Sequence, residues 1–149
     1  MLRLDLSAFL RNREGRKKKV LIKIPSDIKF IRKVSSKILK SLIPYNVDAD
    51  KVFDIKLCAE EAIRNAIVHG NRSDKKLVVK VTYWVEWDNM NIEIEDEGKG
   101  FDRRLIPDPT VGDNIMKGSG RGVYLIKKLM DGMKFNKAGN KIRLVKHLK

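Results

Sequence analysis

The chain has 149 residues, 42% of them hydrophobic and 35% charged, which is typical of one folded domain rather than of a disordered segment, and its apolar runs are too short to span a membrane. A net charge of +14 favours polyanionic partners such as nucleic acid, an acidic protein or a nucleotide, and fits a solvated basic surface equally well. The one cysteine, Cys58, excludes an internal disulfide and, with only two histidines in the chain, a four-ligand zinc site, so we expect it to be a core residue.

Residues 1–17 are expected to form a short basic segment that precedes a domain over residues 18–149. Charged residues interrupt the start of the chain, and it has no small-residue cleavage site, so we expect no secretory leader and a cytoplasmic location. Apolar and polar residues then alternate over residues 19–24, which predicts a strand.

The next two predicted elements are helices. Ser26 is a suitable helix cap, and apolar residues recur at helical spacing over residues 28–42. A second helix is expected to begin near Asp48 or Asp50 and to end at Gly70, because glycine is a common helix stop.

The sequence of the second half of the domain predicts two hairpins and a helix. Alternation over residues 77–94 predicts two long strands joined by a turn at Asp88 and Asn89. Helical spacing returns over residues 121–132, and a final hairpin is expected over residues 133–148. The helices are expected to cover one face of the resulting sheet.

The segment EEAIRNAIVHG places a carboxylate and a carboxamide, Glu61 and Asn65, one helical turn apart at the margin of an apolar face. Such a carboxylate can accept a proton from an attacking hydroxyl, and the amide oxygen can bind Mg²⁺, which prefers oxygen ligands. A glutamate that reaches out to water and an asparagine that caps the helix end explain the same pattern without a site.

Two glycine-bearing segments follow, DEGKGFD and GSGRGVYLI. Asp96 stands at a strand end, where a carboxylate can accept a hydrogen bond from the exocyclic amine of a base; an ordinary turn is the alternative. Residues 118–122 precede a helix and offer backbone N–H groups to phosphate, although the lysine of a P-loop does not follow. The intervening loop is long enough to act as a lid.

These three motifs, in this order, resemble those of the GHKL superfamily, the ATP-binding domains of DNA gyrase, histidine kinases and mismatch-repair proteins. Within it the chain is most similar to the bacterial anti-sigma-factor serine kinases, whose last motif is followed by a helix ending in L-M-D, as in LIKKLMDGM. The resemblance covers residues 20–148. It implies an α+β two-layer sandwich, with a mixed, mainly antiparallel sheet and helices packed on one face.

The same resemblance implies roles for individual residues. Glu61 would be the general base, Asn65 the Mg²⁺ ligand and Asp96 the carboxylate that recognises adenine, with ATP and Mg²⁺ as cofactors. Residues 101–117 would be the ATP lid. The other candidate nucleotide-binding residues are Ala66, Gly98, Gly100, Lys117, Gly118, Ser119, Gly120, Arg121, Gly122 and Val123. Lys117 and Arg121 are candidates to neutralise phosphate charge.

The resemblance also implies a function and partners: an anti-sigma protein-serine kinase, with a sigma factor and a STAS-type anti-anti-sigma protein as partners, and a homodimer. A non-catalytic module that binds ATP and sequesters a regulator is the alternative. A complete sensor kinase is not expected, because no histidine precedes His69. Nucleic-acid binding is disfavoured, since no aromatic-studded strand, zinc pattern or recognition helix accompanies the positive charge.

Overall fold

The computed structural model describes residues 18–98 and 118–149. The predicted basic segment and the predicted lid lie outside these residues. The helices are η1 Ile28–Phe30, α2 Ile31–Lys40, η2 Ile43–Tyr45, α3 Ala49–Asn65, η3 Ala66–Gly70 and α4 Gly118–Leu129. The strands are β1 Val20–Pro25, β2 Val78–Glu86, β3 Asn89–Glu95, β4 Gly132–Phe135 and β5 Lys141–His147.

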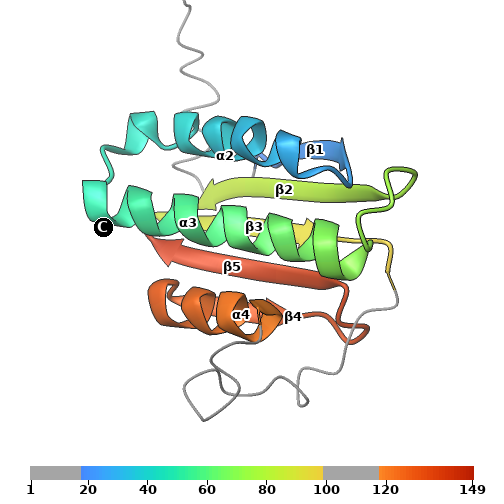
Figure 1. Cartoon of the computed structure of the whole chain (residues 1–149). Helices are drawn as coiled ribbons and strands as arrows, with labels where there is room; N and C mark the ends of the chain where they lie inside the picture. Colours follow the sequence, from blue (N-terminus) through green and yellow to red (C-terminus); the bar gives the residue numbers. More distant parts are fainter. Residues whose placement is uncertain (1–17, 99–117) are drawn as a thin grey trace, which may run out of the picture.

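The strands form one five-stranded sheet in the order β1-β2-β3-β5-β4, and every pairing among the described residues is antiparallel. Helices α2, α3 and α4 lie side by side on one face of this sheet (Figure 1). The expected two-layer α+β sandwich, with a mainly antiparallel sheet and helices on one face, is therefore confirmed.

The alternation that predicted the strands also sets which side chains face the helices. Val81, Ile94 and Ile142 are aligned across three neighbouring strands, and all three side chains are buried. They join the buried apolar side chains of the helices in one core cluster, which includes Ile55 and Ile63 of α3. Burial of this continuous layer is the main term that stabilises the sandwich.

The structure changes one predicted detail of the helices and confirms another. The helical segment begins with η1, and its N-cap is Asp27, which accepts a hydrogen bond from Lys29 N, so the prediction that Ser26 is the cap is wrong. Ser26 is 1% exposed and its hydroxyl donates to Leu77 O instead, because Ser26 directly follows β1 and lies beside the residue that precedes β2. The expected start of α3 at Asp48 is confirmed, since its side chain accepts from the Asp50 amide.

The β2–β3 turn lies one residue earlier than expected. Glu86 pairs with Asn89, so the two turn residues are Trp87 and Asp88 rather than Asp88 and Asn89. Both turn residues have positive φ, 51° at Trp87 and 61° at Asp88, as a two-residue hairpin turn requires. A tryptophan in this conformation is uncommon, which is why the sequence pattern favoured the Asp-Asn pair.

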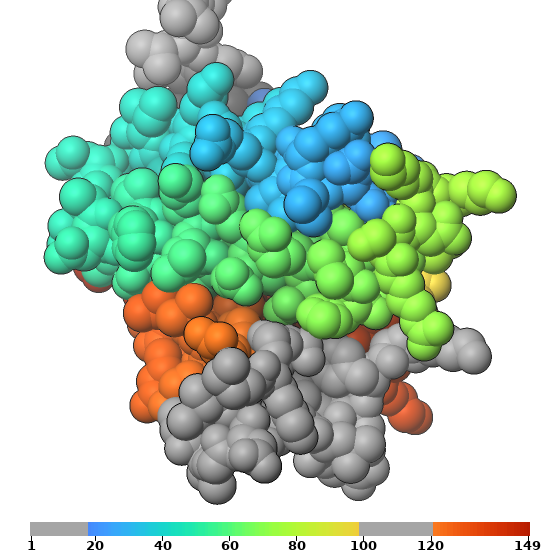
Figure 2. Space-filling model, viewed as in Figure 1, coloured from blue at the N-terminus to red at the C-terminus, as the bar shows by residue number. Residues whose placement is uncertain are grey.

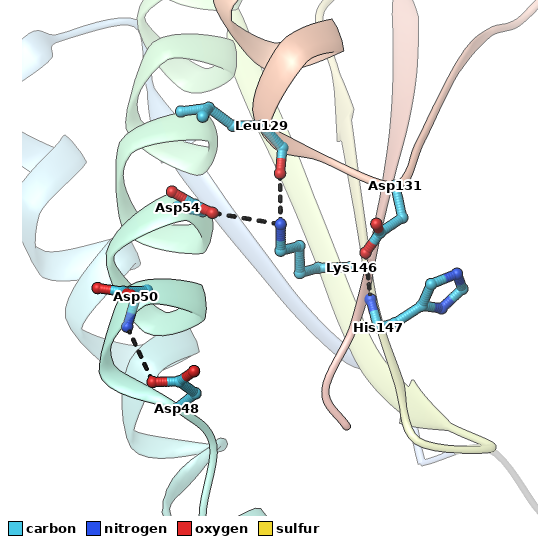
Figure 3. Close-up of polar contacts among 7 residues, drawn as sticks. All are labelled: Asp48, Asp50, Asp54, Leu129, Asp131, Lys146 and His147. Carbon is cyan, nitrogen blue, oxygen red and sulfur yellow. Dashed lines mark hydrogen bonds and ion pairs between the residues drawn. The ribbon is translucent and has the colours of Figure 1, made fainter.

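The C-terminal end of α4 accepts a hydrogen bond from the buried side chain of Lys146 (Figure 3). Lys146 occupies a helix-facing position of β5 and is 8% exposed. Its Nζ forms an ion pair with Asp54 Oδ2 of α3 at 3.2 Å and donates a hydrogen bond to Leu129 O, a terminal carbonyl of α4. Asp131, just beyond α4, accepts from the His147 amide at 2.7 Å. Lys146 thus links β5, α3 and α4, and its charge complements the negative end of α4.

Cys58 lies in the core, as expected, with 0% of its surface exposed. Burial raises the pKa of its thiol from 9.0 to about 12. We therefore expect no reaction of the native protein with a thiol reagent at pH 8, and full reaction after unfolding; rapid labelling of the native protein would contradict this burial. Because the unfolded chain loses the thiol proton at lower pH than the folded chain does, the free energy of unfolding should fall as pH rises from 9.0 toward 12.

Candidate functional site

The carboxylate and carboxamide predicted on α3 meet a glycine of α4. Glu61 and Asn65 are half-buried in the last turns of α3, and Gly122 packs directly against them. A Cβ atom at Gly122 would lie 3.0 Å from Glu61 Oε2 and 3.0 Å from Asn65 Nδ2. Helix α4 lies directly against α3 on this face of the molecule (Figure 2). The absence of a side chain at Gly122 therefore leaves room for the two polar groups.

Asn65 does not cap a helix end. Its backbone is helical, with φ −61° and ψ −40°, and the chain continues as the π-helix η3 to Gly70, where Asn71 is the cap. The alternative explanation of Asn65 as a capping residue is thus wrong. Ala66 follows it and is 6% exposed. Among the described residues, no hydrogen bond or ion pair engages the side chains of Glu61 and Asn65.

Asp96 lies directly after β3 and is half-buried. Its amide donates to Asn140 O at 2.9 Å, and its carbonyl accepts from Asn140 Nδ2 at 3.0 Å. Its Oδ1 accepts from Gly98 N at 2.8 Å. Burial raises the pKa of the Asp96 carboxyl above 3.8; the Gly98 N–H opposes this shift and the charge of Glu95 adds to it. A desolvated carboxylate with an oxygen left to accept hydrogen bonds is suited to a polar ligand group.

Asp96 and Gly98 lie against the end of the helical segment that carries Asn65. A Cβ at Gly70 would lie 2.3 Å from Asp96 Oδ2, and a Cβ at Gly98 would lie 2.1 Å from Gly70 O. A side chain at Gly70 would displace the Asp96 side chain, and a side chain at Gly98 would require the backbone to move. The glycines are needed here for close approach, and the first glycine-bearing segment packs on the end of η3 rather than forming an isolated turn.

The second glycine-bearing segment differs from its prediction. Gly118, Ser119 and Gly120 belong to the first turn of α4, so the expectation that residues 118–122 precede the helix is wrong. Glycine disfavours helix formation by about 1 kcal/mol relative to alanine, which is why the pattern indicated a later start. Arg121 is exposed and Val123 is half-buried. Gly100 and Lys117 lie outside the described residues.

The structure therefore brings together the motifs of three separate segments. Glu61 and Asn65 meet Gly122, and Gly70 meets Asp96 and Gly98. Two asparagines that hold this site were not predicted as site residues. They are Asn140 and Asn71, and the sequence carries no signal for their long-range hydrogen bonds. Asn140 bonds to the carbonyl of Asp96, and Asn71 bonds to the amide of Glu97.

The donor set near Asn65 fits a magnesium ion that is shared with phosphates. In residues 18–98 and 118–149, no group of three His, Cys, Asp or Glu side chains could hold a metal alone. Mg²⁺ keeps several waters and takes substrate phosphates as ligands, so it needs few protein ligands. The Asn65 amide oxygen, half-buried beside Gly122, is of the hard oxygen type that Mg²⁺ binds.

The arrangement of this sheet and these helices is the fold of GHKL ATP-binding domains, as the three motifs led us to expect. The histidine kinase-like ATPase domain family matches residues 24–146, and the chain belongs to this family.

The chain is similar to bacterial serine-protein kinases and to an anti-sigma F factor. The chain is 32% identical over 108 residues to the serine-protein kinase RsbW of Bacillus subtilis (strain 168), a match that covers 66% of each protein. It is 31% identical over 106 residues to the anti-sigma F factor of Anoxybacillus flavithermus (strain DSM 21510 / WK1), covering 66% of this chain and 71% of that protein. The chain thus spans just under two thirds of the first relative.

A solved structure supports the fold. The crystal structure of the RsbU and RsbW domains of Rv1364c from Mycobacterium tuberculosis matches with a TM-score of 0.63 at 18% identity, covering 88% of this chain and 32% of that chain. At this identity the likeness concerns the fold alone. None of the helices in the described part of the chain is long and apolar enough to cross a membrane.

Proposed function

We propose that the protein is an ATP-dependent protein-serine kinase that acts as an anti-sigma factor. The observation that carries the proposal is that the two glycine-bearing segments both contact the helical segment formed by α3 and η3. Gly122 adjoins Glu61 and Asn65 at one point of this segment, and Asp96 adjoins Gly70 at its end. Groups suited to phosphate and to a purine base are thus spaced along α3 and η3, as a bound nucleotide needs.

In this proposal each polar residue has one task. Glu61 accepts the proton of the attacking serine hydroxyl, and the Asp96 carboxylate accepts a hydrogen bond from the adenine amine. Asn65 binds Mg²⁺, which when bound neutralises charge on the phosphates. Arg121 adds positive charge beside them. We assign the backbone of Gly98, Gly118, Gly120 and Gly122, together with Ala66, Ser119 and Val123, to nucleotide contacts, and extend the assignment to Gly100 and Lys117.

The proposed partners follow from the relatives. The names serine-protein kinase and anti-sigma F factor support a sigma factor as the bound regulator and a serine of a STAS-type anti-anti-sigma protein as the phosphate acceptor. We also propose a homodimer, a cytoplasmic location and residues 18–149 as the ATPase domain, with residues 1–17 as a separate basic segment. Nucleic acid and membrane have no role in this proposal.

A transfer assay tests the proposal directly. The protein is incubated with Mg²⁺ and ATP labelled at the γ-phosphate, together with a candidate STAS-type protein, and label on the STAS-type protein is measured. The matched control replaces the acceptor serine of that protein with alanine. We expect transfer to the unmodified acceptor only. Adenine nucleotide binding without transfer to any candidate would favour the non-catalytic module, and no binding at all would refute both.

The space left by Gly122 gives a second expectation. Gly122→Ala places a methyl group 3.0 Å from both Glu61 Oε2 and Asn65 Nδ2, so these side chains must shift. We expect transfer to fall about 10-fold, because small misplacements of reacting groups are costly. The free energy of unfolding should change by less than about 1 kcal/mol, since alanine favours the helix.

Gly132→Ala is the matched glycine control, because its added Cβ would meet only Val145, at 3.3 Å. Transfer by this variant should equal that of the unmodified protein. Equal transfer by Gly122→Ala would show that Glu61 and Asn65 do not need the space beside α4.

A further inference from the structure

A buried network of side chains surrounds the start of the Asp96 segment. Asn71 is 2% exposed and Ser26 is 1% exposed. Asn71 Nδ2 donates to Ser26 Oγ at 2.9 Å and to Val78 O at 3.2 Å. Asn71 Oδ1 accepts a hydrogen bond from Glu97 N at 2.8 Å. One side chain thus joins the end of η3 to β1, to β2 and to the residue after Asp96.

This network supplies hydrogen bonds to the backbone just beyond the end of the β2–β3 pairing. The last β2–β3 pair is Lys80 with Glu95, so the backbone beyond Glu95 has no strand partner on that side. Side chains meet the backbone groups there instead. Glu97 Oε2 accepts from Val78 N at 2.7 Å, and Asn71 serves both Val78 O and Glu97 N. Val78 O and Glu97 N are partly buried, where an unmet backbone group is costly, and the asparagine amide meets one acceptor and one donor.

The orientation of the Asn71 amide is fixed by its partners. Glu97 N can only donate and Val78 O can only accept, so Oδ1 must face the first and Nδ2 the second. A carboxylate of the same shape has no donor for Val78 O, and an aliphatic side chain has neither group. The position therefore requires an amide rather than any residue of similar size.

The peptide unit between Asp96 and Glu97 is held at both of its polar ends. Its carbonyl accepts from Asn140 Nδ2 at 3.0 Å, and its N–H donates to Asn71 Oδ1 at 2.8 Å. These bonds come from opposite sides, one from the β4–β5 turn and one from the end of η3. Fixing this peptide plane fixes the Cα of Asp96 and hence the direction of its carboxylate, which lies against Gly70.

We infer that Asn71 is a positioning residue for the base-recognising end of the nucleotide site. The inference rests on the proposed function, in which Asp96 recognises adenine. The hydrogen bonds of the Asn71 side chain run to Ser26, Val78 and Glu97, whereas the phosphate end of the site lies where Gly122 meets Glu61 and Asn65. Loss of the Asn71 side chain should therefore weaken recognition of the base and leave recognition of the phosphates intact.

The experiment compares two ligands on one variant by calorimetry. Asn71→Ala should bind ADP at least about 10-fold more weakly than the unmodified protein does, because the Asp96 carboxylate is no longer held in register. Its affinity for Mg²⁺-tripolyphosphate, which has no base, should be unchanged. In amide hydrogen exchange, the Glu97 amide should lose protection while that of Ile94, inside β3, keeps it.

Ser26→Ala is the matched control. It removes one partner of Asn71 from the same buried network and leaves the bond to Glu97 N in place. Its thermal unfolding midpoint should fall, with ADP affinity within about threefold of the unmodified protein. If Asn71→Ala does not fold, Asn71→Ser serves for the same comparison, since a hydroxyl is too short to span to the Glu97 amide.

Two outcomes would overturn the inference. One is ADP affinity in the Asn71 variant equal to that of the unmodified protein, and the other is an equal loss of affinity for ADP and tripolyphosphate, which a general loss of structure would give. Failure of the proposed function looks different. In that case the unmodified protein binds neither ADP nor tripolyphosphate, or Asp96→Asn binds ADP as well as the unmodified protein does.

Discussion

Glu61→Gln is expected to bind ATP with nearly unchanged affinity and to transfer its phosphate about 10²- to 10⁴-fold more slowly, the range usual for loss of a general base. Glutamine has the shape of glutamate, so the contact of this side chain with Gly122 is kept. Only the ability to accept a proton is lost. Nucleotide affinity is measured by calorimetry, and transfer is measured as label on the STAS-type acceptor.

The chain supplies a matched control in the adjacent residue. Glu60 accepts a hydrogen bond from Ser35 Oγ of α2 at 3.0 Å, so it points toward α2 rather than toward Gly122. Glu60→Gln changes the charge by the same amount, one residue away, and keeps an acceptor for Ser35. We expect full transfer by this variant. Equal loss in both variants would assign the effect to net charge, and equal transfer by Glu61→Gln would remove Glu61 from the mechanism.

The strands were predictable because a sheet with one covered face imposes a strict alternation. Tyr83, Ile92 and Leu144 lie side by side across the sheet and are buried, and each stands at an apolar position of its own alternating run. This signal is local, since it needs no knowledge of the partner strand. The positions of Glu61 and Asn65 followed in the same way from helical spacing.

The features that were missed depend on contacts between distant segments. Asn71 meets Ser26 and Glu97, which are 45 and 26 residues away in the chain, and no local pattern records such pairs. The early start of α4 has the same origin. Its glycines disfavour a helix locally, and the close approach of α4 to α3 depends on the missing side chain of Gly122, a contact between distant segments.

Lys146 is the point at which the alternation itself fails. The helix-facing positions of β5 are Ile142, Leu144 and Lys146. The first two are apolar, as the alternation predicts, but the third is a buried lysine. A buried ammonium needs partners, and this one has Asp54 and the Leu129 carbonyl. Leu129 and Gly122 both belong to α4. The hydrogen bond from Lys146 to Leu129 O therefore also helps to hold Gly122 against α3.

Lys146→Met should therefore lower the free energy of unfolding by about 2–3 kcal/mol, measured by urea denaturation. Methionine retains most of the apolar stem, so the loss arises from Asp54 and the Leu129 carbonyl, which are left without the ammonium. Asp54 keeps 24% side-chain exposure and can regain water, which places the cost below that of a fully buried pair.

Asp54→Asn should cost less, about 1 kcal/mol, because the amide oxygen still accepts from Lys146. Combining Lys146→Met with Asp54→Asn should cost less than the sum of the two single changes, since the neutral side chain removes the unpaired charge. Lys127→Met, at an exposed position of α4, is the control and should change stability by less than about 0.5 kcal/mol. Strict additivity of the two changes would show that the Lys146–Asp54 ion pair does not contribute to the stability of the fold.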